Sequence, residues 1–148
     1  MKSNSFKRSE VVRSSRSGHN FHECWTARRA LGLLFRQDDL MAMSIEGFST
    51  EEEKEVGESA QEIADLVLYY GGDNFLTSSV VQVVQFKYRC SSGVVTASYL
   101  GETLEKFADT LLEVKKLYGE EVADKKLKFL FVTNAKFTES LYKAIEFI

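Results

Sequence analysis

Three polar residues, Asp65, Gln85 and Lys87, stand in segments that otherwise have the composition of β-strands. Asp65 lies in the apolar run 63–70, and the other two lie in the run 81–89. The segment between the runs is rich in Gly, Asp, Asn and Ser, which predicts a hairpin connection. Because side chains alternate between the two faces of a strand, Gln85 and Lys87 are expected to point the same way.

Buried carboxylate, amide and ammonium groups are costly unless they pair with one another or hold an ion. An aspartate facing an amide and a lysine on the next strand therefore suits a Mg²⁺ site with the lysine beside its bound water. In the structural alternative, Asp65 forms a surface salt bridge, and Gln85 and Lys87 are polar residues of an edge strand. The apolar Val67 and Tyr69, which alternate with Asp65, favour the metal site.

Two further carboxylates are candidates for the same site. Glu46 comes near the end of an apolar run that predicts a strand over residues 40–48, and its alternative is a strand end in water. Glu23 lies near the start of a helix predicted over residues 21–36, where the helix dipole also favours a carboxylate. Which of the two supplies a second carboxylate stays open at this point.

Other polar residues carry weaker signals. His19 and His22 have the spacing H-x-x-H, but no third metal ligand stands at a helpful distance in the sequence. The basic residues of the N-terminal part are candidates for phosphate contacts, and their alternative is ordinary solvated charge. The DNA-binding candidates are Arg13, Arg16, Arg28 and Arg29.

Asp65 and the spacing Gln85-x-Lys87 resemble the PD-(D/E)xK nuclease superfamily, in the variant where Gln replaces the second acidic residue. More narrowly, residues 18–148 are similar to the N-terminal endonuclease domain of bacterial antiphage effectors of the CBASS and STAND-NTPase types. Four segments carry the resemblance in order. They are FHECWTARRALGLL with Glu23, a strand ending in Ile45-Glu46, the hairpin, and KFLFVTNAKF.

This resemblance implies a restriction-endonuclease-like α/β fold, with a mixed sheet flanked by helices. It also implies an endonuclease that hydrolyses double-stranded DNA with Mg²⁺, or with Mn²⁺ in its place. The implied catalytic residues are Asp65, Gln85, Lys87, Glu46 and Glu23, and the implied metal ligands are Asp65, Gln85 and Glu46. The alternative function is a catalytically inactive DNA-binding or assembly module with the same fold, since Gln85 departs from the acidic pattern.

Hydrophobic periodicity independently predicts the element order α-β-β-β-α-β-α. After the two hairpin strands, it predicts a helix over residues 98–118 that Gly119 ends, a strand over 127–134 and a helix from 138. Thr133 and Asn134 are expected to cap that last helix. Residues 49–62 predict either a short helix, opened by a capping box at Ser49, or a solvated loop.

The composition suits one domain with a real core, because 44% of the 148 residues are hydrophobic. Residues 1–17 predict a basic flexible arm, while the net charge of −3 leaves DNA binding to local patches. The absence of an apolar stretch of about 20 residues argues against a membrane span, and two distant cysteines suit a reducing cytoplasm. The chain ends within an apolar helical pattern, which predicts that it is a domain of a longer protein. The resemblance to antiphage effectors implies further domains and assembly into a homo-oligomer on activation.

Overall fold

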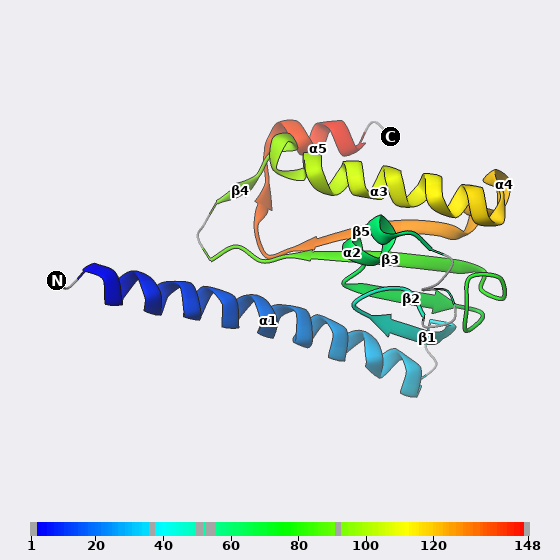
Figure 1. Cartoon of the computed structure of the whole chain (residues 1–148), viewed down its shortest axis with the longest axis horizontal. Helices are drawn as coiled ribbons and strands as arrows, with labels where there is room; N and C mark the ends of the chain where they lie inside the picture. Colours follow the sequence, from blue (N-terminus) through cyan, green and yellow to red (C-terminus); the bar gives the residue numbers. More distant parts are fainter. Residues whose placement is uncertain (1–2, 36–37, 50–51, 53–55, 91–92, 147–148) are drawn as a thin grey trace.

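The computed structural model describes residues 3–35, 38–49, 52, 56–90 and 93–146, with the backbone alone at 3–15, 58–59 and 145–146. A four-stranded sheet lies between a long N-terminal helix on one side and the remaining helices on the other (Figure 1). In chain order the elements are α1 Ser3–Phe35, β1 Leu40–Ile45, α2 Glu58–Ile63, β2 Leu66–Tyr70, β3 Val80–Lys87, β4 Val94–Val95, α3 Ala97–Tyr118, α4 Glu120–Lys126, β5 Leu127–Thr133, β6 Lys136–Phe137 and α5 Glu139–Glu146.

The sheet has the strand order β1-β2-β3-β5 and is mixed. Its first three strands pair antiparallel, and β5 pairs parallel with β3. Parallel neighbours need a crossover connection, and α3 and α4 supply it between β3 and β5. The strands β4 and β6 form a separate two-stranded sheet. The prediction of a mixed sheet flanked by helices is confirmed.

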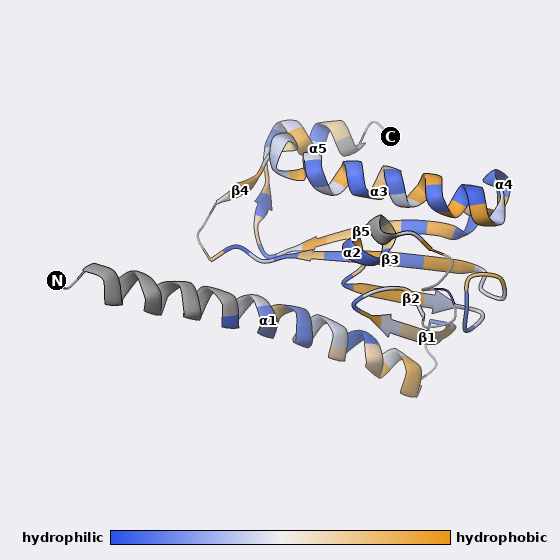
Figure 2. Cartoon of the chain, in the orientation of Figure 1, coloured by the Kyte–Doolittle hydropathy of each residue, from blue (hydrophilic) through white to orange (hydrophobic). Residues whose placement is uncertain are grey.

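Each face of the sheet has its own hydrophobic core. Alternate residues of the central strands, including Val67, Tyr69, Val81 and Val83, pack on the side of α3. The residues between them pack on the side of α1, where Leu66, Leu68, Val84 and Phe86 are buried with partly buried residues of the helix. Figure 2 shows the resulting hydrophobic colouring of β2 and β3. Burial on both faces explains why these runs are almost continuously apolar.

The predicted helix 98–118 matches α3 closely. Thr96 caps it, because its hydroxyl oxygen accepts a hydrogen bond from the Tyr99 N–H at 3.2 Å. Gly119 ends it with a φ of 91° and donates its N–H to the Lys115 carbonyl at 2.9 Å. Thr96 and Gly119 thus fix where α3 begins and ends. The helix covers one face of the sheet along its length (Figure 1).

The N-terminal helix is longer than predicted. It begins at Ser3, whereas hydrophobic periodicity predicted a start near Phe21. The boundary expected between residues 17 and 18 therefore falls inside α1, and the backbone of residues 3–17 is helical. The first half of the helix extends past the ends of the strands (Figure 1), whereas an amphipathic pattern arises where a helix packs on a core. None of the described helices has the length and hydrophobicity of a membrane span.

Other boundaries also differ from the predicted ones. β1 ends at Ile45 instead of Phe48, and β2 begins at Leu66 instead of Ile63. The short elements α2, β4, α4 and β6 are additions to the predicted order. Asn134 does not cap the last helix, because its side chain bonds the backbone of Arg89 instead, at 2.8 and 2.9 Å. This exchange ties together the ends of β3 and β5.

A buried carboxylate holds the segment before α2 against the β2–β3 connection. Glu52 is 6% exposed, and its Oε2 accepts a hydrogen bond from the Tyr69 hydroxyl at 2.6 Å. Its Oε1 accepts from the Phe75 N–H at 2.5 Å. The Ser49 N–H donates in turn to the Tyr69 hydroxyl oxygen. Glu52 is thus a tertiary anchor, rather than part of the capping box that the sequence predicted.

Candidate active site

Asp65 lies in the bend between α2 and β2, one residue before the strand begins. Its N–H donates to the Val84 carbonyl at 3.1 Å, and its carbonyl accepts from the Glu46 N–H at 3.0 Å. The prediction that it lies within a strand starting at Ile63 is wrong, because α2 continues to that residue. Strand alternation therefore does not assign Asp65 to one face, and its side chain lies at the end of the sheet.

Gln85 and Asp65 are brought together by the strand register. Leu66 of β2 pairs with Val84 of β3, so the next residues outward, Asp65 and Gln85, face each other. The Gln85 Nε2 donates a hydrogen bond to the Asp65 Oδ2. The Phe86 N–H donates to the same oxygen at 2.6 Å. The carboxylate thus serves as the acceptor for a backbone N–H of β3, while Gln85 restrains its orientation.

The orientation of the Gln85 amide differs from the predicted one. A shared metal ion would require the Gln85 carbonyl oxygen to face the same point as the Asp65 carboxylate. It is the amide nitrogen that faces Asp65 in this arrangement. Gln85 therefore acts on Asp65 as a hydrogen-bond donor and is not disposed as a ligand of an ion bound there.

Lys87 ends β3 and is half-buried. By strand alternation it shares a face with Gln85, as predicted from the sequence. It forms no ion pair with any carboxylate that the structure describes, but its charge lowers the pKa of Asp65. Gln85 and Lys87 continue the alternation of Val81 and Val83, so they lie on the side of β3 that faces α3. Lys87 therefore reaches Asp65 through its charge and does not line the pocket on the α1 side.

Glu46 follows the last residue of β1 in an uncommon backbone conformation. Its φ of 58° lies in the left-handed region, which non-glycine residues seldom adopt. The hydrogen bond from its N–H to the Asp65 carbonyl joins this turn to the start of β2. Gly47 follows with a φ of 133°, and a Cβ there would approach the Gln61 Oε1 to 2.2 Å. The turn therefore requires glycine at 47 and leaves the Glu46 side chain exposed beside Asp65.

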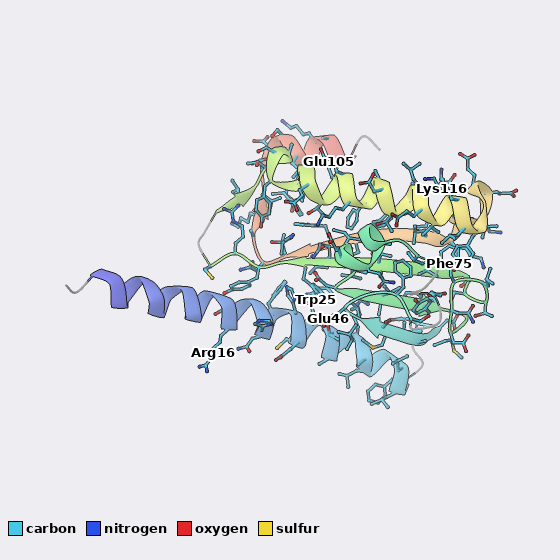
Figure 3. The ribbon with its side chains drawn as sticks, viewed as in Figure 1. Arg16, Trp25, Glu46, Phe75, Glu105 and Lys116 are labelled. Carbon is cyan, nitrogen blue, oxygen red and sulfur yellow. The ribbon has the colours of Figure 1, made fainter. Side chains whose placement is uncertain are left out.

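A pocket of about 460 Å³ lies between α1 and the ends of β1 and β2, and we call it the acidic pocket. Carboxylates from three separate segments line it, and these are Glu23, Glu46 and Asp65. All three were candidates from the sequence. In Figure 3, Glu46 lies on the side of the sheet that α1 covers. The sequence thus indicated the acidic members of this pocket, although only the fold brings them together.

The two histidines also line the acidic pocket, which sequence spacing did not predict. His19, His22, Glu23 and Thr26 have the spacing i, i+3, i+4, i+7, so they lie along one side of α1. The His22 ring packs against Phe86, with ring centroids 5.0 Å apart. The helical spacing of these polar residues predicts that they share one side of a helix, but it does not predict which other elements that side faces.

Burial raises the pKa of Asp65 above its usual value. The Phe86 N–H, the charges of His22 and Lys87, and the Gln85 amide lower it, but they do not fully offset the desolvation. Both hydrogen bonds reach Oδ2, and Oδ1 accepts none from the part of the chain that the structure describes. One oxygen of Asp65 is therefore available for a ligand.

The chemistry of the pocket fits a hard divalent cation. Mg²⁺ keeps several waters and is held by one or two carboxylates, so a complete cage of protein ligands is not required. Within the described residues, no three His, Cys, Asp or Glu side chains are close enough to form such a cage. Asp65 Oδ1 would bind the ion directly, and Glu46 and Glu23 would act through its waters or on a small movement of their exposed side chains.

The predicted DNA-binding arginines do not converge on this pocket. Arg28 and Arg29 line a different pocket on the other side of α1. Arg16 is exposed and points away from the sheet in Figure 3. Arg13 belongs to the residues whose side chains the structure does not describe.

Searches of protein-family models and of curated proteins find no match to this chain.

Proposed function

We propose that this chain is a metal-dependent endonuclease domain that hydrolyses phosphodiester bonds of double-stranded DNA. The observation that carries the proposal is the convergence of Asp65, Glu46 and Glu23 on one pocket, with Gln85 bonded to Asp65. The sequence resemblance to the PD-(D/E)xK superfamily supplies the reaction and the duplex substrate. The mixed sheet flanked by helices is compatible with the restriction-endonuclease-like fold that this resemblance implies.

Asp65 is the principal ligand in this proposal. A bound Mg²⁺ or Mn²⁺ would supply activation of water and neutralisation of charge on the phosphate. The Phe86 N–H and the Gln85 amide hold the Asp65 carboxylate through Oδ2, and Oδ1 accepts no hydrogen bond from the described residues. Oδ2 thus fixes the orientation of the carboxylate, and Oδ1 is left to bind the metal ion.

Lys87 acts by charge in the proposed reaction. Its ammonium acts on Asp65 by charge and forms no ion pair with a described carboxylate. Because Lys87 lies on the α3 side of β3, it would meet a substrate phosphate at the end of the sheet and not inside the acidic pocket. It would orient the attacking water and stabilise the negative charge that develops on the phosphate. Glu46 and Glu23 add negative charge at the wall of the pocket, where a hydrated cation is favoured.

The test is cleavage of supercoiled plasmid with Mg²⁺, with Mn²⁺ and with EDTA. The wild type is expected to nick or linearise the plasmid only with a divalent cation. Lys87→Ala is expected to reduce the rate by about a hundredfold or more, since it removes a charge that stabilises the transition state. Lys116→Ala is the matched control, because Lys116 lies on α3, away from the acidic pocket (Figure 3). Equal rates for the two variants would contradict the assigned role of Lys87.

The alternative is a catalytically inactive module that binds DNA or mediates assembly. One specific observation favours it, namely that Gln85 presents its amide nitrogen to Asp65. In that case Gln85 and Asp65 satisfy each other, and the pair has a structural role. Binding of duplex DNA without cleavage by wild-type protein in either metal would support this alternative and contradict the enzyme.

The resemblance further supports a role as an antiphage effector domain whose activity depends on assembly. If cleavage needs two domains side by side, its rate should rise more steeply than linearly with protein concentration. Fusion to a dimerising tag should then raise the rate at low concentration. A rate that is linear in concentration and unaffected by the tag would contradict control by assembly.

A further inference from the structure

A second pocket lies on the other side of α1 from the acidic pocket. The residues of α1 that line the acidic pocket are His19, His22, Glu23, Thr26, Ala27 and Ala30. The second pocket instead takes Trp25, Arg28, Arg29 and Gly32, together with Leu31 and Phe35 near the end of the helix. Each set recurs at spacings of three and four residues, so α1 forms a ridge between two separate pockets.

This second pocket, which we call the arginine pocket, has a volume of about 600 Å³. Two arginines, Arg28 and Arg29, line it together with the aromatic residues Trp25 and Tyr70 and the acidic Asp38. The remaining lining residues are mostly apolar. Its size lies within the range of about 300–1,000 Å³ that small-molecule sites occupy.

The groups of the arginine pocket lie close to one another. The Arg29 guanidinium carbon lies 5.5 Å from the centre of the Trp25 ring, in a cation–π contact. Burial raises the pKa of Tyr70, the positive charge of Arg29 lowers it, and the negative charge of Asp38 raises it. The charges of Arg29 and Asp38 therefore both act on Tyr70. Arg29 also contacts Trp25, so these four residues belong to a single site.

Each group has a counterpart in one class of ligand. Guanidinium groups bind phosphate oxygens in pairs, and aromatic rings stack on nucleobases. A carboxylate accepts hydrogen bonds from the amino groups of a base or the hydroxyls of a sugar. With two positive charges against one negative charge, the site favours an anion. A base alone or a phosphate alone would leave part of this wall unused.

We propose that the arginine pocket binds a single nucleotide, with its phosphate on Arg28 and Arg29 and its base against the aromatic wall. The nucleotide is either free or a unit of a nucleic-acid strand, since both present the same base and phosphate. The proposal does not rest on cleavage at the acidic pocket, because the two pockets lie on different sides of α1 and the arginine pocket needs no metal ion.

The chain contains one tryptophan, Trp25, which lines this pocket. Intrinsic tryptophan fluorescence therefore reports directly on the proposed site. The experiment titrates the full chain, in EDTA, with adenosine, guanosine, cytidine and uridine 5′-monophosphates. At least one is expected to change the fluorescence with saturation, while adenosine and inorganic phosphate bind at least about tenfold more weakly. A change that never saturates with any of the four nucleotides would overturn the proposal.

Two substitutions test the groups that line the wall. Arg28→Gln is expected to weaken nucleotide binding by about tenfold or more, because it removes a charged phosphate donor. Asp38→Asn should alter the preference among the four bases. Arg16→Gln is the matched control, since Arg16 is exposed and points away from the sheet (Figure 3). Equal binding by Arg28→Gln and the wild type, with circular dichroism unchanged, would overturn the assigned site.

Further ligands separate the sources of the nucleotide and exclude a rival class. A short single-stranded oligonucleotide that binds more tightly than its mononucleotide identifies a strand as the source, and the reverse order identifies a free nucleotide. Phenyl phosphate that binds as tightly as the best nucleotide would overturn the proposal in favour of an aryl phosphate such as phosphotyrosine. Asp65→Asn is expected to retain nucleotide binding. A loss of cleavage at the acidic pocket is therefore distinguishable from a loss of nucleotide binding at the arginine pocket.

Discussion

Two carboxylates of this protein, Glu52 and Asp65, have similar partners but different surroundings. Each accepts one hydrogen bond from a side chain and one from a backbone N–H of the β2–β3 hairpin or its connection. Glu52 divides these bonds between its two oxygens and is almost completely buried. Asp65 accepts both on one oxygen and lines a pocket.

The difference indicates what separates a structural carboxylate from a candidate ligand. Every oxygen of Glu52 is used to hold two segments together, so removing it should affect folding. Asp65 keeps Oδ1 available, and its pKa is raised by burial, so its ionised form is disfavoured until a cation or another positive charge compensates. Four predictions test this contrast, and they begin with the largest expected effect.

Asp65→Asn should abolish cleavage while preserving the fold. An asparagine oxygen can still accept the bonds from Gln85 and Phe86, but the negative charge toward the ion is lost. We expect the rate of plasmid cleavage to fall on the order of a thousandfold or more. Asp109→Asn, an exposed position on α3, is the control. A rate within a few-fold of wild type would contradict the role of Asp65 as a ligand.

Glu52→Gln should reverse this pattern. The amide group cannot accept hydrogen bonds on both of its ends, so either the Tyr69 hydroxyl or the Phe75 N–H loses its partner. We expect the free energy of unfolding to fall by about 1–3 kcal/mol, measured by urea denaturation. The cleavage rate per folded molecule should stay unchanged. Loss of activity without loss of stability would show that Glu52 has a functional role.

Gln85→Glu should make the stability of the folded protein depend on a divalent cation bound at Asp65. Two carboxylates would then face each other where an amide now donates to a carboxylate, and their repulsion is relieved by a bound divalent ion. The variant should have a lower melting temperature than wild type in EDTA and a larger upward shift with Mg²⁺. The exposed substitution Lys116→Gln, which also changes the net charge by −1, controls for the change in charge. Equal Mg²⁺ shifts in wild type and Gln85→Glu would contradict a metal site at Asp65.

The smallest expected effect is on the pH dependence of stability. A carboxyl group whose pKa is raised on folding binds more protons in the folded state, so it lowers stability as pH rises above its unfolded pKa of 3.8. Asp65→Asn, in metal-free buffer, should therefore be more stable than wild type at neutral pH. The advantage should shrink as the pH falls toward 3.8. A variant that is less stable at neutral pH would show that the Asp65 charge stabilises the fold.

Of these two carboxylates, only Asp65 could be singled out from the sequence. Asp65 stood out because a charge interrupts an apolar run. That pattern predicted a functional residue at a position that the structure places just before β2. Glu52 stands among other glutamates in the segment before α2, so nothing in its neighbourhood distinguishes it. Its role depends on Tyr69 and Phe75, which are distant in sequence. Contacts of this kind do not produce local patterns.

The start of β2 illustrates why element boundaries were less predictable than their existence. The run from Ile63 to Tyr70 is apolar apart from Asp65, and both a helix end and a strand can bury such residues. Packing of α2 against α3 places Ile63 and Ala64 in the core as the end of a helix. The strand is therefore shorter, and Asp65 is left at the end of the sheet.

The sequence by itself determined the α/β class, the hairpin, the helix α3 with its end at Gly119, and the acidic candidates. These follow from periodicity and composition, which act over a few residues. Only the tertiary structure decided that Glu23, Glu46 and Asp65 share one pocket, that His22 belongs to it, and that Arg28 and Arg29 line another. The reason is that pockets form where segments distant in sequence meet, and the packing of α1 across the sheet sets which side of the helix each residue faces.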